Sequence, residues 1–183
     1  FDGRYITGDV SDAEFAALGD PFFTLVLKEH ADVVDLAEIE RLIQPDAQKR
    51  SLFVVDERIA DASRGSSRRA VLTFEGFGSH GEALTANLMA SVMFNSDAFP
   101  TNMAAANPAQ RPDFIEFWGW DQSRARYNYY RLDSEPGSGL TWKFRGSSDR
   151  GAVLADRRDT CFACHINGGP AMKVTSSNTV SSE

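Results

Sequence analysis

The feature that most constrains this chain is a pair of cysteines close to its C-terminal end. Cys161 and Cys164 are its only two cysteines, and His165 follows the second one directly. This spacing places two thiols and an imidazole within one short segment, where they can hold a single group together. With 183 residues, the chain is long enough to form one domain with its own hydrophobic core, and that domain has to accommodate this segment.

The pattern Cys-x-x-Cys-His is the one used for covalent attachment of a c-type haem. Each thiol can add to one vinyl group on the same porphyrin edge. The imidazole of the next residue then lies where its neutral nitrogen can bind the iron. The sequence therefore predicts one covalent haem c, attached to Cys161 and Cys164, with His165 as the proximal iron ligand.

Three other structures could use the same residues. A redox dithiol normally opens a helix after the first strand of a βαβ unit, whereas this pair lies near the end of the chain. A zinc site would need a fourth ligand, and the adjacent Cys164 and His165 are awkwardly placed to share one tetrahedral metal. A disulfide across two intervening residues is strained and closes almost no loop. Haem attachment is favoured, and the dithiol and metal alternatives stay open.

Composition and charge narrow the class of protein. The chain is 42% hydrophobic and 25% charged, as soluble globular proteins are, and no apolar run is long enough to span a membrane. A net charge of -7 argues against nucleic acid and favours a docking partner with a neutral or basic face. Because haem c is attached outside the bacterial cytoplasm, we expect a periplasmic or secreted protein whose targeting segment was removed or lies outside this numbering.

Hydrophobic periodicity and helix-capping patterns divide the first half of the chain into short elements. The apolar run 22–27 fits either a buried strand or the start of a helix. The two ends, residues 1–10 and 175–183, are expected to be loosely ordered. Helices are expected at residues 11–19, 35–43 and 79–94, and strands at 52–55 and 70–77.

The clearest prediction is a three-strand antiparallel meander over residues 114–120, 125–132 and 140–144. It contains all three tryptophans and every tyrosine except Tyr5, so it can serve as an aromatic core or as a wall against the haem. The predicted fold class is α+β: an antiparallel sheet with this C-terminal meander, flanked by a few helices and packed around one haem, in a single domain of residues 1–183. Alternation along the third strand places Leu140, Trp142 and Phe144 on one side and Thr141, Lys143 and Arg145 on the other.

Several side chains are candidates for further contacts with the haem. Met103 lies on a proline-bounded loop that could fold over the open haem face, and Met172 follows a Gly-Gly-Pro turn shortly after the motif. Either could be the sixth iron ligand, and His80 is a third candidate. Methionines at other positions, Met89 and Met93, are expected to belong to the core. The basic run of Arg64, Arg68 and Arg69 could bind a haem propionate or a partner, or simply be solvated.

The pentad Cys161-Phe162-Ala163-Cys164-His165 makes the chain resemble a c-type cytochrome. A motif near the C-terminus after a mostly antiparallel sheet is similar to the cytochrome P460 and cytochrome c′-β group. That resemblance implies a sheet-and-helix sandwich around one haem, and reactions with hydroxylamine or small gases such as nitric oxide. Proteins of the P460 kind cross-link a lysine to the haem well upstream of the motif, and this chain has no lysine between Lys49 and Lys143.

The sixth iron ligand separates two functions. A methionine or second histidine there would close the iron and leave outer-sphere electron transfer as the natural role. An empty position would allow nitric oxide, carbon monoxide or peroxide to bind. Because no catalytic acid–base constellation stands out, the sequence predicts a monohaem c-type cytochrome that carries single electrons to or from a redox partner protein, rather than an enzyme. The alternative is a five-coordinate haem protein for small gases or nitrogen oxides. The aromatic sheet could also support a homodimer.

Overall fold

The structure, a computed structural model, describes ten parts of the chain, and every structural statement below concerns these parts. They are residues 13, 16–44, 49–57, 67–76, 88–94, 99–107, 110–135, 137, 139–148 and 179–181. The N-terminal residues 1–10 fall outside them, as do residues 11, 12, 14 and 15 of the predicted helix at 11–19. Of the C-terminal residues that were expected to be loosely ordered, 179–181 form a short strand.

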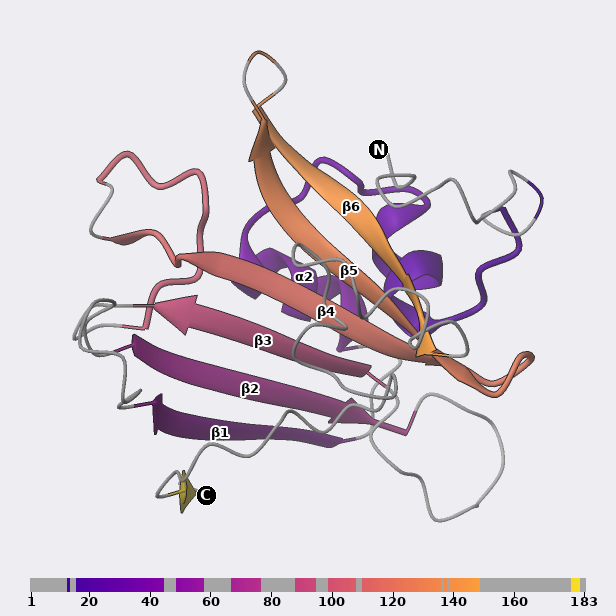
Figure 1. The fold of residues 1–183 in the computed structure, drawn as a ribbon, viewed down its shortest axis with the longest axis horizontal. Coiled ribbons are helices and arrows are strands. Elements are labelled where there is room, and N and C mark those ends of the chain that lie inside the picture. Colours follow the sequence, from indigo (N-terminus) through magenta and orange to yellow (C-terminus); the bar gives the residue numbers. More distant parts are fainter. Residues whose placement is uncertain are drawn as a thin grey trace.

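Six long antiparallel strands form a single sheet (Figure 1). Each strand pairs with its neighbour in the sequence, so the sheet is an up-and-down meander with the order β6-β5-β4-β3-β2-β1. A three-residue strand, β7, pairs with the outer side of β1, so β6 and β7 occupy opposite edges. The strands are β1 (Lys49–Glu57), β2 (Ser67–Glu75), β3 (Leu88–Phe94), β4 (Phe114–Asp121), β5 (Arg126–Glu135), β6 (Gly139–Ser147) and β7 (Thr179–Ser181).

Two short helices lie on the same side of this sheet (Figure 1). The first, η1 (Phe23–Leu27), is a π-helix, and the second is α2 (Leu36–Ile43). Asp35 caps α2, because its side chain accepts hydrogen bonds from two backbone N–H groups of the first turn, at 2.9 and 3.2 Å. The helical spacing of Leu36, Ile39 and Ile43 then turns all three side chains toward the sheet, where they are buried.

Strand alternation gives the sheet two different faces. The core face carries Leu72, Ala90, Phe117, Tyr130 and Trp142, and both helices pack on it. The charged face carries the side chains in between, and its members are described with the candidate site below. The described residues contain no helix that is long and apolar enough to cross a membrane.

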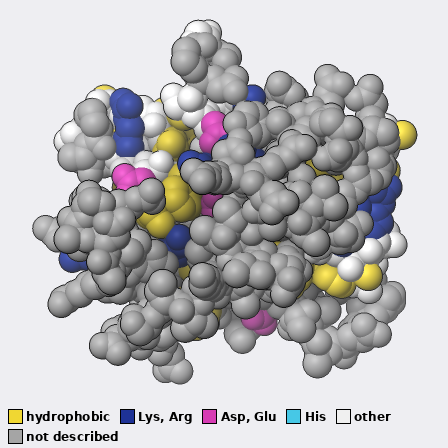
Figure 2. Space-filling view, in the orientation of Figure 1, with side chains coloured by type: hydrophobic (Ala, Val, Ile, Leu, Met, Phe, Trp, Pro, Cys, Tyr) yellow, Lys and Arg dark blue, Asp and Glu magenta, His cyan; other side chains and the backbone are white. Residues whose placement is uncertain are grey.

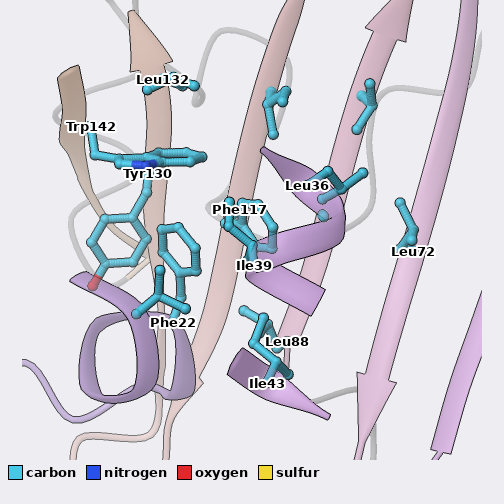
Figure 3. Close-up of a cluster of buried hydrophobic side chains, with 14 of the residues drawn as sticks. Phe22, Leu36, Ile39, Ile43, Leu72, Leu88, Phe117, Tyr130, Leu132 and Trp142 are labelled. Carbon is cyan, nitrogen blue, oxygen red and sulfur yellow. The ribbon is translucent and has the colours of Figure 1, made fainter. Parts of the chain in front are cut away.

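An aromatic cluster fills the core face (Figure 3). Phe22, just before η1, stacks on Phe117 with ring centroids 4.2 Å apart, and its edge contacts Trp142 at 4.9 Å. Tyr130 completes the cluster at 5.2 Å from Phe22. The indole nitrogen of Trp142 donates a hydrogen bond to the carbonyl of Val33, between the two helices, at 2.9 Å. The side chains of this face therefore bury one another through stacked and edge-to-face ring contacts.

The antiparallel sheet and its aromatic meander are confirmed, and the sheet is wider than the sequence suggested, so the fold is mostly β. The ambiguous run at 22–27 forms a helix. The prediction of a helix continuing to Phe94 is wrong for residues 88–94, which form β3. These residues are largely apolar on both sides of the strand, so their periodicity fits a helix or a buried strand. Pairing with β2 and β4 decides in favour of the strand.

Candidate functional site

Most residues that the sequence singled out for haem binding lie outside the described parts of the chain. These are Cys161, Cys164, His165 and Met172, together with His80 and Arg64. Their assignments stay predictions from the sequence. The described candidates are Met103, Arg68 and Arg69.

Met103 belongs to a loop that is fixed to the start of α2. The N–H of Leu36 donates to the carbonyl of Thr101 at 2.8 Å, and Asp35 pairs with Asn102 in a single antiparallel bridge. Met103 is partly buried and packs against the hydrophobic cluster of the core face. Its thioether thus has a packing role in the described structure, and its role as an iron ligand stays a prediction.

The charged face of the sheet is buried although it carries several ionic side chains. Arg69 on β2 is 6% exposed, and Lys143 and Arg145 on β6 are 3% and 4% exposed. Charged residues are rarely buried to this extent in proteins unless they have partners of opposite charge. Figure 2 shows, on one side of the molecule, Lys and Arg side chains next to hydrophobic and acidic ones. The ionic members of the charged face are Arg69, Glu116, Arg131, Asp133, Lys143 and Arg145.

Ion pairs join neighbouring strands across this face. Asp133 accepts from Arg145 at 2.5 Å and lies 3.2 Å from Nε of Arg131, so one carboxylate bridges two guanidinium groups. Arg131 also lies 4.0 Å from Glu116. Burial raises the pKa of Glu116, while the nearby positive charges of Arg131, Arg69 and Arg145 oppose that shift. The positive charges of arginines on β2, β5 and β6 therefore lower the pKa of the Glu116 carboxyl group, against the effect of burial.

Aromatic side chains lie among these ions on the same face. Trp118 is 3% exposed and stacks near Tyr129, with ring centroids 6.5 Å apart and planes 21° apart. The guanidinium of Arg131 lies 5.0 Å above the ring of Phe114, and that of Arg69 lies 5.8 Å from it. Met89 on β3 pairs with Trp118 in the sheet register. The charged face thus combines flat apolar surface with cationic groups.

A separate polar cluster closes one end of the core face around Asp20. This carboxylate is fully buried, and one of its oxygens accepts from Tyr130 Oη at 2.5 Å and from Asn128 Nδ2 at 2.8 Å. The other oxygen accepts from the N–H of Phe23 at 3.1 Å. Burial raises the pKa of Asp20 to about 6, because desolvation outweighs the three hydrogen bonds. A Cβ at Gly119 would lie 2.6 Å from this carboxylate, so only glycine leaves room for it.

Asp121 holds the adjacent backbone in the same way. It accepts from the N–H of Gly19 at 3.1 Å and from the backbone and hydroxyl of Ser123 at 3.1 and 2.6 Å. Together Asp20 and Asp121 attach the start of η1 to β4 and β5. Because the hydrogen bonds of both carboxylates go to the protein itself, this cluster is suited to anchoring the fold. Sequence reasoning missed it, although an aspartate before Pro21 is a common helix start and was the available signal.

The described residues contain no group of three or more His, Cys, Asp or Glu side chains placed to hold a metal ion. Comparisons of the chain with known protein families, with curated proteins and with solved structures found no match. The function has to be inferred from the residues themselves.

Proposed function

We propose that this protein is a monohaem c-type cytochrome that carries single electrons to or from a redox partner protein. The observation that carries the proposal is the pentad Cys161-Phe162-Ala163-Cys164-His165, which contains the only cysteines of the chain. Two thiols and one imidazole are the complete donor set for covalent attachment and proximal ligation of one haem. The same residues make an incomplete zinc site and lie in an unusual place for a redox dithiol.

In this function each residue of the pentad has a separate role. When bound, the haem supplies one-electron redox chemistry at its iron. Cys161 and Cys164 hold the porphyrin by covalent bonds, so it is retained even when the chain unfolds. His165 would supply a neutral imidazole nitrogen to hold the iron. Apolar side chains around such a haem would exclude water and thereby tune the reduction potential.

Net charge and haem chemistry also suggest where the protein works. Attachment of haem c outside the cytoplasm places the proposed cytochrome in the periplasm or among secreted proteins. A net charge of -7 favours a partner with a neutral or basic docking face, because opposite charges speed encounter and orient the two proteins.

A second candidate function is supported by the position of Met103. This residue packs against the hydrophobic cluster of the core face, so one candidate for the sixth ligand is already engaged in packing. An iron without a sixth ligand would bind small gases or nitrogen oxides, as the resemblance to the P460 and c′-β group implies. The two functions differ in one property, which is whether an external ligand reaches the iron at once.

The test begins with covalent attachment. The protein is produced with a bacterial haem c maturation system, denatured, and examined for haem that stays with the polypeptide. We expect one haem per chain, and none in the double variant Cys161→Ala, Cys164→Ala. A colourless wild-type protein, or haem that is released on denaturation, would contradict the proposal.

Carbon monoxide then separates the two candidate functions. Reduced protein with a closed iron should keep its sharp low-spin absorption bands when the gas is added. An immediate shift of these bands would reject the electron-carrier function in favour of the gas-binding one.

A further inference from the structure

We propose that β1 is the dimerisation edge of this protein, where β1 of a second copy of the chain pairs antiparallel about Phe53 in place of β7. The proposed function makes no use of this edge, so the two proposals can fail independently. The inference rests on exposed apolar side chains at the centre of β1, on the order of charges along the strand and on the short length of β7.

The centre of β1 carries exposed apolar side chains at the edge of the sheet (Figure 1). Phe53 and Val54 are each 37% exposed, and Phe99 is the only other large hydrophobic side chain of the described residues with this exposure. Phe53 pairs with Val71 on the charged face, and Val54 pairs with Ala70 on the core face. The edge is therefore apolar on both faces, which is typical of a strand that another strand can join.

The outer side of β1 is only partly paired in the described structure. β1 has nine residues, whereas β7 has three and pairs with Phe53, Val54 and Val55. Over the rest of β1, no described strand lies on this side. A longer strand that replaced β7 would form more cross-strand pairs, and such pairs stabilise a sheet.

The order of charges makes β1 complementary to itself. The strand reads Lys-Arg-Ser-Leu-Phe-Val-Val-Asp-Glu, with two basic residues first, an apolar centre and two acidic residues last. When two copies pair antiparallel about Phe53, each residue lies opposite the one that is equally far from this centre. Lys49 then lies in register with Glu57 of the second copy, and Arg50 with Asp56. Opposite charges directly across an antiparallel pair are stabilising.

This register also agrees with the two faces of the sheet. A two-fold axis perpendicular to the sheet keeps both core faces on the same side, so paired residues share a face. Phe53 then meets Phe53 of the second copy on the charged face, and Leu52 meets Val54 on the core face. Moving the centre to Val54 would place Leu52 opposite Asp56 and separate the opposite charges, so the pattern favours the register about Phe53.

Arg50 can contribute to this contact while keeping its partner within the chain. Its side chain is 43% exposed and donates to Glu40 of α2 at 2.7 Å. A guanidinium has five N–H donors, so this ion pair leaves donors for Asp56 of the second copy.

Phe53→Cys tests the dimer and its register together. Two copies of residue 53 on the two-fold axis would have Cα atoms about 5 Å apart. Ser51→Cys is the matched control on the same strand and face, and its two copies would lie about 14 Å apart because they are four residues out of register. We expect a bis-maleimide too short to span that distance to cross-link Phe53→Cys into dimers and Ser51→Cys no more than the wild type.

The wild type measures any cross-linking through Cys161 and Cys164, which all three proteins contain. Equal cross-linking of the two variants, or none above the wild type in Phe53→Cys, would overturn the proposal.

Analytical ultracentrifugation of the full chain measures the dimer without any reagent. We expect a wild-type dimer, and Phe53→Lys should raise its dissociation constant by about tenfold or more, since two like charges would meet at the axis. Phe99→Lys is the control, because Phe99 has the same exposure and lies outside β1. A monomeric wild type, or a dimer that Phe53→Lys weakens no more than Phe99→Lys does, would overturn the proposal.

Val180→Pro tests the competition between β7 and the second copy. Val180 pairs with Val54 at the middle of β7, and proline disrupts a paired strand because it lacks an N–H donor. We expect this variant to have a lower dimer dissociation constant than the wild type. An unchanged or higher value would overturn the replacement of β7 by the second copy.

Discussion

The two faces of the sheet differ in the chemistry of their buried side chains. On the core face, Phe22, Phe117, Tyr130 and Trp142 contact one another and the helices, and the polar groups of the Asp20 cluster form hydrogen bonds within the protein. On the charged face, arginines and a lysine lie beside Trp118 with almost no exposure. Charges cost free energy when they are buried, so the charged face contributes less to stability per residue.

This difference indicates that the core face, rather than the charged face, provides most of the packing that maintains the fold. The core face is closed by side chains from the strands and helices of the described structure. The charged face instead carries buried ion pairs, such as Asp133 with Arg145 and Arg131, beside its aromatic side chains. Substitutions on the two faces should therefore have different consequences, which the following predictions use.

The largest effect on stability is expected from Phe22→Ala. Its ring lies at the centre of the aromatic cluster with no exposure, and large-to-small substitutions of buried phenylalanine cost about 3–5 kcal/mol. Urea unfolding followed by far-UV circular dichroism measures this loss. Phe53→Ala, on the exposed side of β1, is the control and should cost far less, since Phe53 is 37% exposed. Similar losses for both variants would contradict the role of the core face.

An intermediate effect on the free energy of unfolding is expected when the carboxyl group of Asp20 titrates. Its pKa is raised from 3.8 to about 6 on folding, so between these values the folded protein holds a proton that the unfolded chain has lost. Stability from this group is complete below pH 3.8 and is lost as the pH rises through 6, by about 3 kcal/mol. Burial raises the pKa of Glu116 as well, which adds a loss of the same sign.

The variant Asp20→Asn removes this titration. The difference in the free energy of unfolding between wild type and variant should change by about 2 kcal/mol between pH 4 and pH 7, in the direction of a less stable wild type at high pH. Asp32→Asn, on an exposed turn, serves as the control. A difference that stays constant over this range would show that Asp20 does not titrate as its burial predicts.

The smallest effect is expected from Met103→Leu. The side chain packs against the core-face cluster, and a swap of similar volume costs less than about 1.5 kcal/mol. If the thioether of Met103 serves only in packing, the visible spectrum of the haem should be unchanged. Loss of the low-spin bands in this variant would instead identify Met103 as the sixth ligand and contradict a role in packing alone.

Parts of this fold could be predicted because local pattern and tertiary packing agree. The alternation at Leu140, Trp142 and Phe144 correctly assigned one side of β6, and the spacing after Asp35 correctly predicted α2. Residues 88–94 failed because both sides of that strand are apolar, so only the neighbouring strands determine its structure.

The candidate site was harder to predict than the fold. Alternation separated Lys143 and Arg145 from the core residues, but it gave no sign that these cations would be buried. Burial of a charge depends on what packs over it, which is not a local property of a strand. Asp20 was missed for a similar reason, because its partners Asn128 and Tyr130 are more than a hundred residues away.

The measurement that tests the proposed function most directly is the haem content of the polypeptide after denaturation. The protein is produced with a bacterial haem c maturation system, unfolded, and separated from any free haem before its absorption spectrum is recorded. We predict one haem per chain that stays with the polypeptide through Cys161 and Cys164. A colourless polypeptide, or haem released on unfolding, would contradict the account.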